Sequence, residues 1–372
     1  MNTNSKNALS LDTVRLSEDH KEIIILDQTL LPGECRFISL RTGEEIWEAI
    51  YLLRVRGAPA IGVTGAYGYY ILSCRLETED KEEFVRACAE NMEYLNSSRP
   101  TAVNLSWALN RMHDVMLKNL DRMTLDQLKE RLREEADAIY NEDVAISRSI
   151  GRYGFELLEE LGRGTGIMTH CNAGTLATAK YGTALAPVYI ALEEGWDPKK
   201  DLHVYCDETR PLLQGARLSA FEMQQAGVDT YVQCDNMASY TMKSGKIGII
   251  FVGCDRVAAN GDFANKIGTS GVAILARHYG IPFYVCAPSS TIDMAIETGD
   301  EIRIEQRKPE EVTEMWYEKR MAPEGVGVVN PAFDVTDHEL VTGIITEKGI
   351  ARAPFREAFE AMGIRPVEKY VK

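Results

Sequence analysis

Residues Met168 to Ala177 read Met-Thr-His-Cys-Asn-Ala-Gly-Thr-Leu-Ala. The apolar residues that end at Met168 predict a short strand, and the Asn-Ala-Gly segment predicts a turn into a helix that begins at about Thr175. A thiol between a strand end and a helix N-terminus lies where backbone N–H groups favour a thiolate, and the same place suits a phosphate. Cys171 is therefore the first candidate for a reactive group, and an enzyme is the first hypothesis.

Beyond Gly164, short apolar runs alternate with helical patterns. The expected strands cover residues 167–169, 203–206, 230–233, 247–253 and 282–287, and the expected helices cover 175–194, 214–226 and 266–279. This alternation favours an α/β fold with a mainly parallel, doubly wound sheet, in which ligands bind outside the carboxyl ends of the strands. Cys171, Asp207, Asp235 and Asp255 each follow an expected strand, so we expect a site at that edge.

The chain of 372 residues exceeds one typical core, which predicts more than one domain. Residues 22–40 predict two strands, and helical patterns follow to about residue 120. A long helix is expected from Thr124, where Gln127 completes a capping-box pattern. We therefore expect a small N-terminal α/β domain over 1–123, a connecting helix over 124–160 and a C-terminal catalytic domain over 161–372.

Composition and charge exclude several classes of protein. The net charge of −15 disfavours a basic surface for nucleic acid, and no apolar stretch is long enough for a membrane span. Met1 to Arg15 contain no apolar core of signal-peptide length, and the eight cysteines form no Cys-x-x-Cys pair, so we expect a reduced, cytoplasmic protein. No dinucleotide fingerprint, Walker A motif or metal-ligand cluster occurs, which predicts no organic cofactor and no required metal.

The first candidate binding segment runs from Arg54 to Gly62 and reads Arg-Val-Arg-Gly-Ala-Pro-Ala-Ile-Gly. Its proline suits the first turn of a helix, and its first glycine permits a close backbone approach. Arg56, Gly57 and Ala58 are thus candidates for a phosphate or sugar contact. An ordinary turn between two helices explains the spacing equally well.

The second segment, Asp207 to Arg217, joins an expected strand to an expected helix. Arg210 and Arg217 are candidates for a phosphate clamp, and Gln214 for a hydrogen bond to a sugar hydroxyl. The alternative is a solvated loop in which Asp207 pairs with Arg210.

The third segment, Gly253 to Thr269, is the richest in polar groups. Asp255 follows a strongly apolar strand, so we expect a partly buried carboxyl with a raised pKa that can act as a general acid. The alternative is a pair with Arg256 or a turn cap. Asn265 and Lys266 are expected at a helix start, which favours anions. His170 precedes Cys171, but neighbouring strand residues point to opposite faces, so a structural role is the better interpretation.

Several motifs, in order from about residue 26 to 355, resemble one family. They are Leu26-Asp-Gln-Thr-Leu-Leu-Pro32, Arg56-Gly-Ala-Pro-Ala-Ile-Gly62, Ser98-Arg-Pro-Thr-Ala-Val-Asn104, Thr169-His-Cys-Asn-Ala-Gly174, Asp207–Arg217, Gly253–Gly268, Asn330-Pro-Ala-Phe-Asp-Val-Thr336 and Ile345-Thr-Glu-Lys-Gly-Ile350. Together they look like methylthioribose-1-phosphate isomerases. That family is related to the alpha, beta and delta regulatory subunits of a eukaryotic translation-initiation exchange factor.

The resemblance implies a small N-terminal domain, a Rossmann-like C-terminal domain and a homodimer. It implies that Cys171 is the catalytic cysteine and Asp255 the catalytic acid. It also assigns the substrate-binding positions, which are Arg56, Gly57, Ala58, Arg99, Gln214, Asn265 and Lys266.

The sequence departs from the family pattern at some places. It has Cys254 where alanine is common, Ser270-Gly271 where Tyr-Ser is common, Ser289 where an apolar residue is common, and Arg303 where proline is common. None of these is Cys171 or Asp255, but they leave open what the sugar carries at its 5-position: a methylthio group, hydrogen or a phosphate. A non-enzymatic regulatory subunit and a redox-sensing cysteine protein are the competing classes. The first predicts that the catalytic Cys and Asp are absent, and the second predicts a resolving Cys near Cys171.

Overall fold

A computed structural model describes residues 12–100 and 102–365 of the chain. Most of the segment from Met1 to Arg15, expected to lack a signal peptide, lies outside these residues. The described chain forms two compact units. The N-terminal unit extends to Ala145 and also includes Gly174–Gly182, and the C-terminal unit comprises Ile146–Ala173 and the chain from Thr183 onward.

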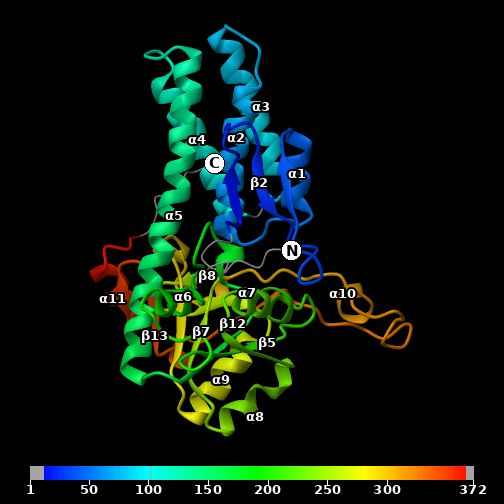
Figure 1. Cartoon of the computed structure of the whole chain (residues 1–372), viewed down its shortest axis with the longest axis vertical. Coiled ribbons are helices and arrows are strands. Elements are labelled where there is room, and N and C mark those ends of the chain that lie inside the picture. Colours follow the sequence, from blue (N-terminus) through cyan, green and yellow to red (C-terminus); the bar gives the residue numbers. More distant parts are fainter. Residues whose placement is uncertain (1–11, 101, 366–372) are drawn as a thin grey trace. The chain divides into compact units, whose positions relative to one another are not determined.

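The N-terminal unit begins with a three-stranded antiparallel sheet in the order β1-β2-β3 (Figure 1). These strands span Val14–Leu16, Ile23–Leu26 and Phe37–Leu40. The two strands predicted over residues 22–40 are confirmed, and β1 is an addition. Ile23 and Ile25 point to the same side of β2 and are fully buried, as the period of two requires.

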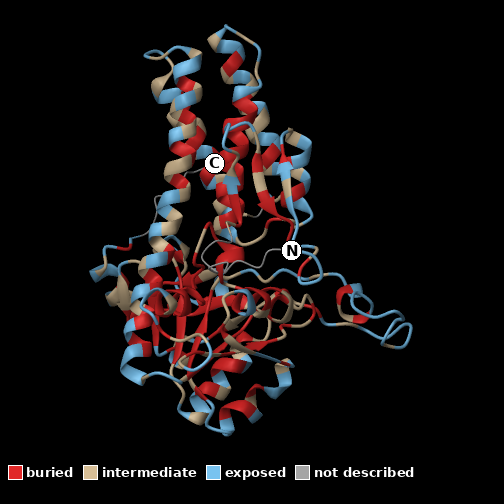
Figure 2. Ribbon diagram, in the orientation of Figure 1, coloured by how far each residue is buried: buried red, intermediate tan, exposed pale blue. Residues whose placement is uncertain are grey.

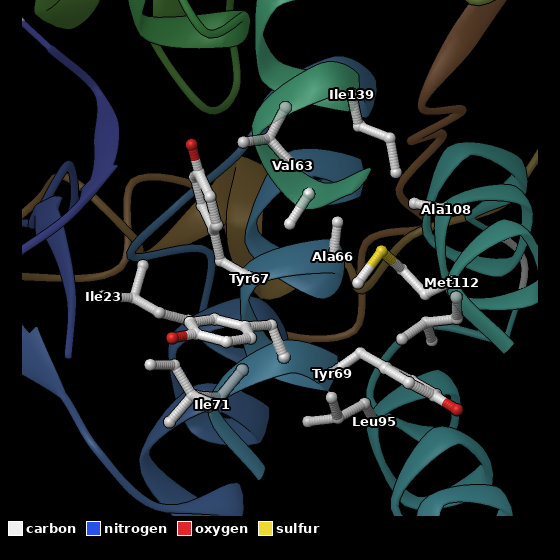
Figure 3. Packing of buried hydrophobic residues seen from close by; sticks show 14 of the residues in the cluster. Ile23, Val63, Ala66, Tyr67, Tyr69, Ile71, Leu95, Ala108, Met112 and Ile139 are labelled. Atoms are coloured by element: carbon white, nitrogen blue, oxygen red, sulfur yellow. The ribbon is translucent and has the colours of Figure 1, made fainter. Parts of the chain in front are cut away.

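Helices make up the rest of this unit. They are α1 (Gly43–Tyr51), α2 (Ala58–Cys74), α3 (Lys81–Ser97), α4 (Val103–Asn119) and the first part of α5 (Leu125–Leu161). Helix α2 is apolar all round and almost wholly buried, which is the pattern of a central helix. Tyr67, Tyr69 and Ile71 of α2 pack in the same core as Met112 of α4 and Ile139 of α5 (Figure 3).

Helix α5 begins with the predicted capping box. The Thr124 N–H donates to Gln127 Oε1 over 2.9 Å, and the Gln127 N–H donates to Thr124 Oγ1 over 3.3 Å. These two bonds satisfy backbone donors that the first helical turn leaves without partners. The boundary between the two units falls inside this helix, between Ala145 and Ile146.

The C-terminal unit is built on a seven-stranded sheet in the order β14-β13-β10-β7-β4-β5-β6. The five predicted strands are β4 (Gly166–Thr169), β5 (His203–Asp207), β6 (Asp229–Gln233), β7 (Ile247–Val252) and β10 (Phe283–Cys286), and all of them pair in parallel. The added strands β13 (Gly343–Thr346) and β14 (Gly349–Ala351) complete the sheet, with only β14 antiparallel. The central strands are buried (Figure 2). The predicted mainly parallel, doubly wound α/β fold is confirmed.

The strand order reverses beside β4. After β4 the chain adds β5 and β6 on one side, and then returns to place β7 on the other side of β4. The carboxyl ends of β4 and β7 therefore flank the switch point at which open parallel sheets bind their ligands.

A second, four-stranded sheet in the order β11-β8-β9-β12 was not predicted. Its strands are β8 (Arg256–Ala258), β9 (Phe263–Lys266), β11 (Ile292–Asp293) and β12 (Phe333–Thr336). They are short, and the sequence of β8 and β9 reads as one polar loop, so periodicity gave no signal. The helices of this unit are α6 (Ala186–Glu193), α7 (Ala220–Gln225), α8 (Ala238–Lys243), α9 (Thr269–Tyr279), α10 (Glu310–Thr313) and α11 (Phe355–Ala361).

The helix expected over residues 175–194 is wrong in its first half. Only a single 3-10 turn forms at Thr175–Ala177, and α6 begins at Ala186. Within the N-terminal unit, other groups bond the backbone that a helix would have used: Thr13 Oγ1 donates to Thr175 O, and Gln28 Nε2 donates to Leu176 O, each over 2.8 Å. Cys171 therefore does not face a helix N-terminus, because these contacts replace the helical hydrogen bonds.

Candidate active site

Cys171 lies immediately beyond β4 at the switch point, where its main chain is left-handed with φ of 66°. Such a conformation costs a residue with a side chain about 1–3 kcal/mol and persists only when surrounding contacts hold it. The side chain is 8% exposed, so the thiol is close to the surface without being open to it. A reactive group held in a strained turn at the ligand edge of the sheet fits the predicted catalytic position.

Two buried hydroxyl groups bond the main chain of Cys171. Its N–H donates to Thr209 Oγ1 over 2.9 Å, and its carbonyl accepts from Ser219 Oγ over 2.7 Å. Both hydroxyl residues are fully buried. The backbone of the turn is therefore fixed from both sides.

A buried carboxylate supports the same turn. Asn172 Nδ2 donates to Glu222 Oε1 over 2.6 Å, and Tyr189 donates its hydroxyl to Glu222 Oε2 over 2.8 Å. Glu222 on α7 is inaccessible to solvent. Because a buried carboxyl group is costly unless it is hydrogen-bonded, these bonds stabilise the turn that follows Cys171.

Asp255 lies beyond β7 on the other side of the switch point. The two loops are in contact, since Gly253 packs against the side chain of Ala173. The expectation of a partly buried carboxyl is wrong, because Asp255 is exposed. Its backbone N–H donates to Ala264 O over 2.9 Å, which fixes the loop directly before β8 against β9. Arg256 pairs with Asp293 at 3.7 Å.

His170 links three parts of the sheet edge. Its Nε2 donates to Ile267 O over 2.8 Å, and its Nδ1 faces Asp207 Oδ2 at 3.2 Å. Burial disfavours the charged imidazolium, but the hydrogen bond and the attraction to Asp207 outweigh this and raise the pKa of His170. The other carboxylate oxygen, Asp207 Oδ1, accepts a hydrogen bond from Gln233 Nε2. These contacts favour the structural interpretation of His170. Among the described residues, the Asp207 carboxylate bonds to His170 and Gln233 rather than to Arg210.

Asn265 and Lys266 lie at the end of β9, three to four residues before α9 begins, and not at a helix start as predicted. The N-terminus of α9 already has an anion, because Asp334 accepts from the N–H groups of Gly268 and Ser270. The Lys266 ammonium lies 4.2 Å from the centre of the Phe333 ring. Any attraction that this segment has for phosphate therefore comes from the lysine charge rather than from the helix end.

Gln214 directly precedes a π-helical turn, Gly215–Ser219, that leads into α7. The side chain is 7% exposed, and its Oε1 atom has no hydrogen-bond partner in the described part of the chain. A buried amide oxygen without a partner costs about 1–3 kcal/mol. Such a group is the feature expected of a side chain that bonds a ligand, because the ligand would supply the missing donor.

The two arginines of the same loop are occupied by aromatic rings. The Arg210 guanidinium lies 5.6 Å from the centre of the Tyr317 ring and donates to Val312 O, and the Arg217 guanidinium lies 4.9 Å from the Trp316 ring. These contacts favour a role for both arginines in packing against aromatic rings over the predicted phosphate clamp.

The remaining predicted positions belong to the N-terminal unit. Gly57 caps α2 with φ of 89°, Ala58 is the first helical residue, and Arg56 directly precedes them. A Cβ at Gly57 would lie 2.2 Å from Ala177 O, so this position admits only glycine. Arg99 lies between α3 and α4. The first turns of α2 and α4 also approach each other, since a Cβ at Gly62 would lie 3.0 Å from Asn104 O. This end of the helical unit thus carries two cations and a helix N-terminus.

The sequence prediction missed Thr209, Ser219 and Glu222. Each is an ordinary residue in a loop or helix, and only the fold places it against Cys171 or Asn172. No group of three His, Cys, Asp or Glu side chains that could hold a metal occurs in residues 12–100 and 102–365. Within the same ranges, no helix has the length and apolar character to cross a membrane.

The chain resembles known proteins over nearly all of its length. The model of the Initiation factor 2 subunit family matches residues 54–353. A methylthioribose-1-phosphate isomerase from Symbiobacterium thermophilum is 58% identical over 96% of this chain and 98% of its own. A 5-deoxyribose 1-phosphate isomerase from Petrotoga mobilis is 50% identical over 94% of this chain and 98% of its own. The crystal structure of 5-methylthioribose 1-phosphate isomerase from Pyrococcus horikoshii OT3 has a TM-score of 0.89 at 41% identity and covers 97% of this chain and 98% of that one.

These matches define the class first: an α/β protein of the Initiation factor 2 subunit family with a polar site at the switch point of its parallel sheet. Within that class, the chain belongs to the methylthioribose-1-phosphate isomerase family, as its motifs indicated.

Proposed function

We propose that this protein converts a 5-substituted ribose 1-phosphate into the corresponding ribulose 1-phosphate. We propose that its main substrate is S-methyl-5-thioribose 1-phosphate and that this conversion is a step of methionine salvage. The observation that carries the proposal is the placement of Cys171 and Asp255 in the two loops that follow the strands flanking the switch point. The buried Gln214 oxygen, which has no partner among the described residues, adds a group that a ligand can bond. The isomerase names of highly similar relatives support the same activity.

The substrate is an aldose whose anomeric oxygen carries phosphate, so its ring cannot open to a free aldehyde by itself. We assign Asp255 the donation of a proton to the ring oxygen as the C1–oxygen bond breaks. Cys171 removes the proton from C2 and returns a proton to C1. The C2 hydroxyl gives its proton to the Asp255 carboxylate, which restores the acid and leaves the C2 carbonyl of the ketose 1-phosphate. Because Asp255 is exposed in the structure, we expect the bound sugar to cover its carboxyl and so favour its protonated form.

We propose the remaining substrate-binding residues from the family motifs, for each unit by itself. In the N-terminal unit, Arg56, Gly57 and Ala58 offer a side-chain charge and the N-terminus of α2, and Arg99 offers a second positive charge. In the C-terminal unit, the ammonium group of Lys266 offers a positive charge. Gln214 and Asn265 are assigned to sugar hydroxyls, since both are buried amides that can bond them. We propose that neither a metal nor an organic cofactor takes part, and full activity after dialysis against a chelator would support this.

Solvent deuterium tests the proton route. In deuterated water, removal and return of a proton through Cys171 places deuterium at C1 of the product. Complete absence of label would instead favour direct hydride transfer from C2 to C1, with Cys171 only relaying a hydroxyl proton. Mass spectrometry of the product distinguishes the two results.

The group at the sugar 5-position is tested by comparing kcat/KM for the 5-methylthio, 5-deoxy and 5-phospho substrates. Relatives named for 5-deoxyribose 1-phosphate favour the 5-deoxy sugar as a second substrate. A hydrophobic pocket separates such groups by only about 1–3 kcal/mol, so we expect both to react. The 5-phosphate should react most slowly, because the sequence shows no second basic pocket. Failure of all three would favour a regulatory binding protein instead.

We further propose that the protein acts as a homodimer in the cytoplasm. None of its eight cysteines forms a disulfide, which suits a reducing compartment. Light scattering of the purified protein tests the oligomeric state.

A further inference from the structure

The main chain of Cys171 is left-handed, and the residues that hold it there are not among those assigned to the substrate. A left-handed residue with a side chain is uncommon, and this one is the proposed base of the reaction. The thiol can act only if the main chain of Cys171 is held in one place. The residues that hold it lie outside the groups assigned to the substrate.

Thr209 bridges the turns after β4 and β5. Its Oγ1 accepts the Cys171 N–H over 2.9 Å and donates to Asp207 O over 3.0 Å. Thr209 is itself left-handed, with φ of 64°, and its own N–H donates to Asp235 Oδ1 over 2.7 Å. Asp235, which follows β6, thus fixes Thr209, and Thr209 fixes Cys171.

Ser219 bonds the main chain on the other side of Cys171. Its Oγ donates to Cys171 O over 2.7 Å and accepts from Asn172 Nδ2 over 3.2 Å. Ser219 is the last residue of the π-helical turn, and such turns are frequent at functional sites. The turn can approach this closely because position 215 is glycine: a Cβ there would lie 1.7 Å from Asp207 O and 2.9 Å from Thr209 Oγ1.

We propose that Thr209 and Ser219 are positioning residues of the isomerase reaction, whose hydroxyl groups hold the main chain of Cys171 in the left-handed conformation that presents its thiol to the sugar. This inference rests on the proposed function of Cys171. Neither hydroxyl is assigned a contact with the substrate. Thr209 acts through the Cys171 N–H and Ser219 through the Cys171 carbonyl.

Kinetics of matched variants test the inference. Thr209→Val removes the hydroxyl at nearly constant volume, Thr209→Ser keeps it, and Ser219→Ala removes the other one. Misplacement of a reacting group by about 1 Å can lower the rate about 10²-fold. We expect Thr209→Val and Ser219→Ala to lose kcat on this scale for methylthioribose 1-phosphate with little change in KM, and Thr209→Ser to retain most of the activity.

Thr346 provides a control in the same unit. It is fully buried, and its Oγ1 also accepts one backbone N–H, from Lys348, and donates to one backbone carbonyl, of Gly349. Thr346→Val should lower the melting temperature to a similar extent as Thr209→Val and leave kcat unchanged. Equal losses of kcat in the two variants, or no rescue by Thr209→Ser, would overturn the inference.

Hydrogen exchange measures the hold on Cys171 without reference to catalysis. Loss of the Thr209 acceptor should speed exchange of the Cys171 amide in Thr209→Val, while Thr346→Val should leave it as in the parent protein. An unchanged rate in Thr209→Val overturns the positioning role. Full activity of Cys171→Ser would overturn the proposed function instead, so the two failures are distinguishable.

Discussion

The two sides of the switch point differ in how the protein holds its two proposed catalytic residues. Cys171 is nearly buried, its backbone accepts and donates bonds to buried hydroxyls, and a buried carboxylate supports the next residue. Asp255 is exposed and lies in a loop that joins the large sheet to the small one. The protein therefore fixes the thiol before substrate arrives, whereas the environment of the carboxyl depends on what binds over it.

This contrast has an energetic reason. When a catalytic group is ordered before the substrate binds, its conformational entropy is lost during folding. Hydrogen bonds formed in the folded state have to offset that loss. An exposed carboxyl needs no such network, but it becomes an effective acid only when water is excluded. Substitutions on the two sides should accordingly affect catalysis alike and stability differently.

The largest expected effect concerns the rate. Cys171→Ser and Asp255→Asn should each fold and lose about 10²–10⁴-fold in kcat, because positioned acid and base groups contribute on this scale. Steady-state kinetics with methylthioribose 1-phosphate measure both. If either variant keeps nearly full activity, the substituted residue does not have the acid or base role proposed for it.

The second effect concerns stability. Glu222→Leu removes the acceptor of two buried hydrogen bonds, from Asn172 Nδ2 and from the Tyr189 hydroxyl, which should lower the free energy of unfolding by about 1–3 kcal/mol. Asp255→Leu changes an exposed side chain and should lower the free energy of unfolding by less than Glu222→Leu does. Urea unfolding of both variants is the measurement. Equal losses in the free energy of unfolding would show that the loop after β4 is not held more strongly than the loop after β7.

The smallest effect concerns pH. Asp143 on α5 is half-buried and accepts from the Ala179 N–H over 2.7 Å; burial raises its pKa from 3.8 to about 7. The folded state then binds a proton that the unfolded chain has already lost, so the contribution of Asp143 to stability is greatest below about pH 4 and is lost as the pH rises to 7. Asp143→Asn should remove this fall and be more stable than the parent at pH 8 by about 1 kcal/mol, since solvent screens part of the shift.

Thermal melting between pH 4 and 8 checks this prediction. If the parent protein and Asp143→Asn have parallel pH profiles, the carboxyl of Asp143 is not desolvated.

The prediction succeeded where a pattern was long or a motif was local. The five parallel strands, the capping box of α5 and the positions of Cys171 and Asp255 after β4 and β7 follow from apolar runs and turn residues. It failed where a segment bonds to residues far along the chain. The 3-10 turn at Thr175–Ala177 replaces a helix because Thr13 and Gln28 supply its hydrogen bonds. Asn265 and Lys266 end a strand because β12, some seventy residues later, pairs with β9.

The sequence by itself determined the family and the doubly wound sheet, and it supplied the two candidate catalytic residues, because these depend on local order along the chain. Only the tertiary structure decided how Cys171 is held and that Asp255 is exposed. Thr209, Ser219 and Glu222 are unremarkable in sequence, and they act on the Cys171 turn because folding closes loops of about forty to fifty residues between them. A reactive thiol can thus be recognised from its neighbours in the chain, but the geometry that makes it useful comes from residues that only the fold brings near.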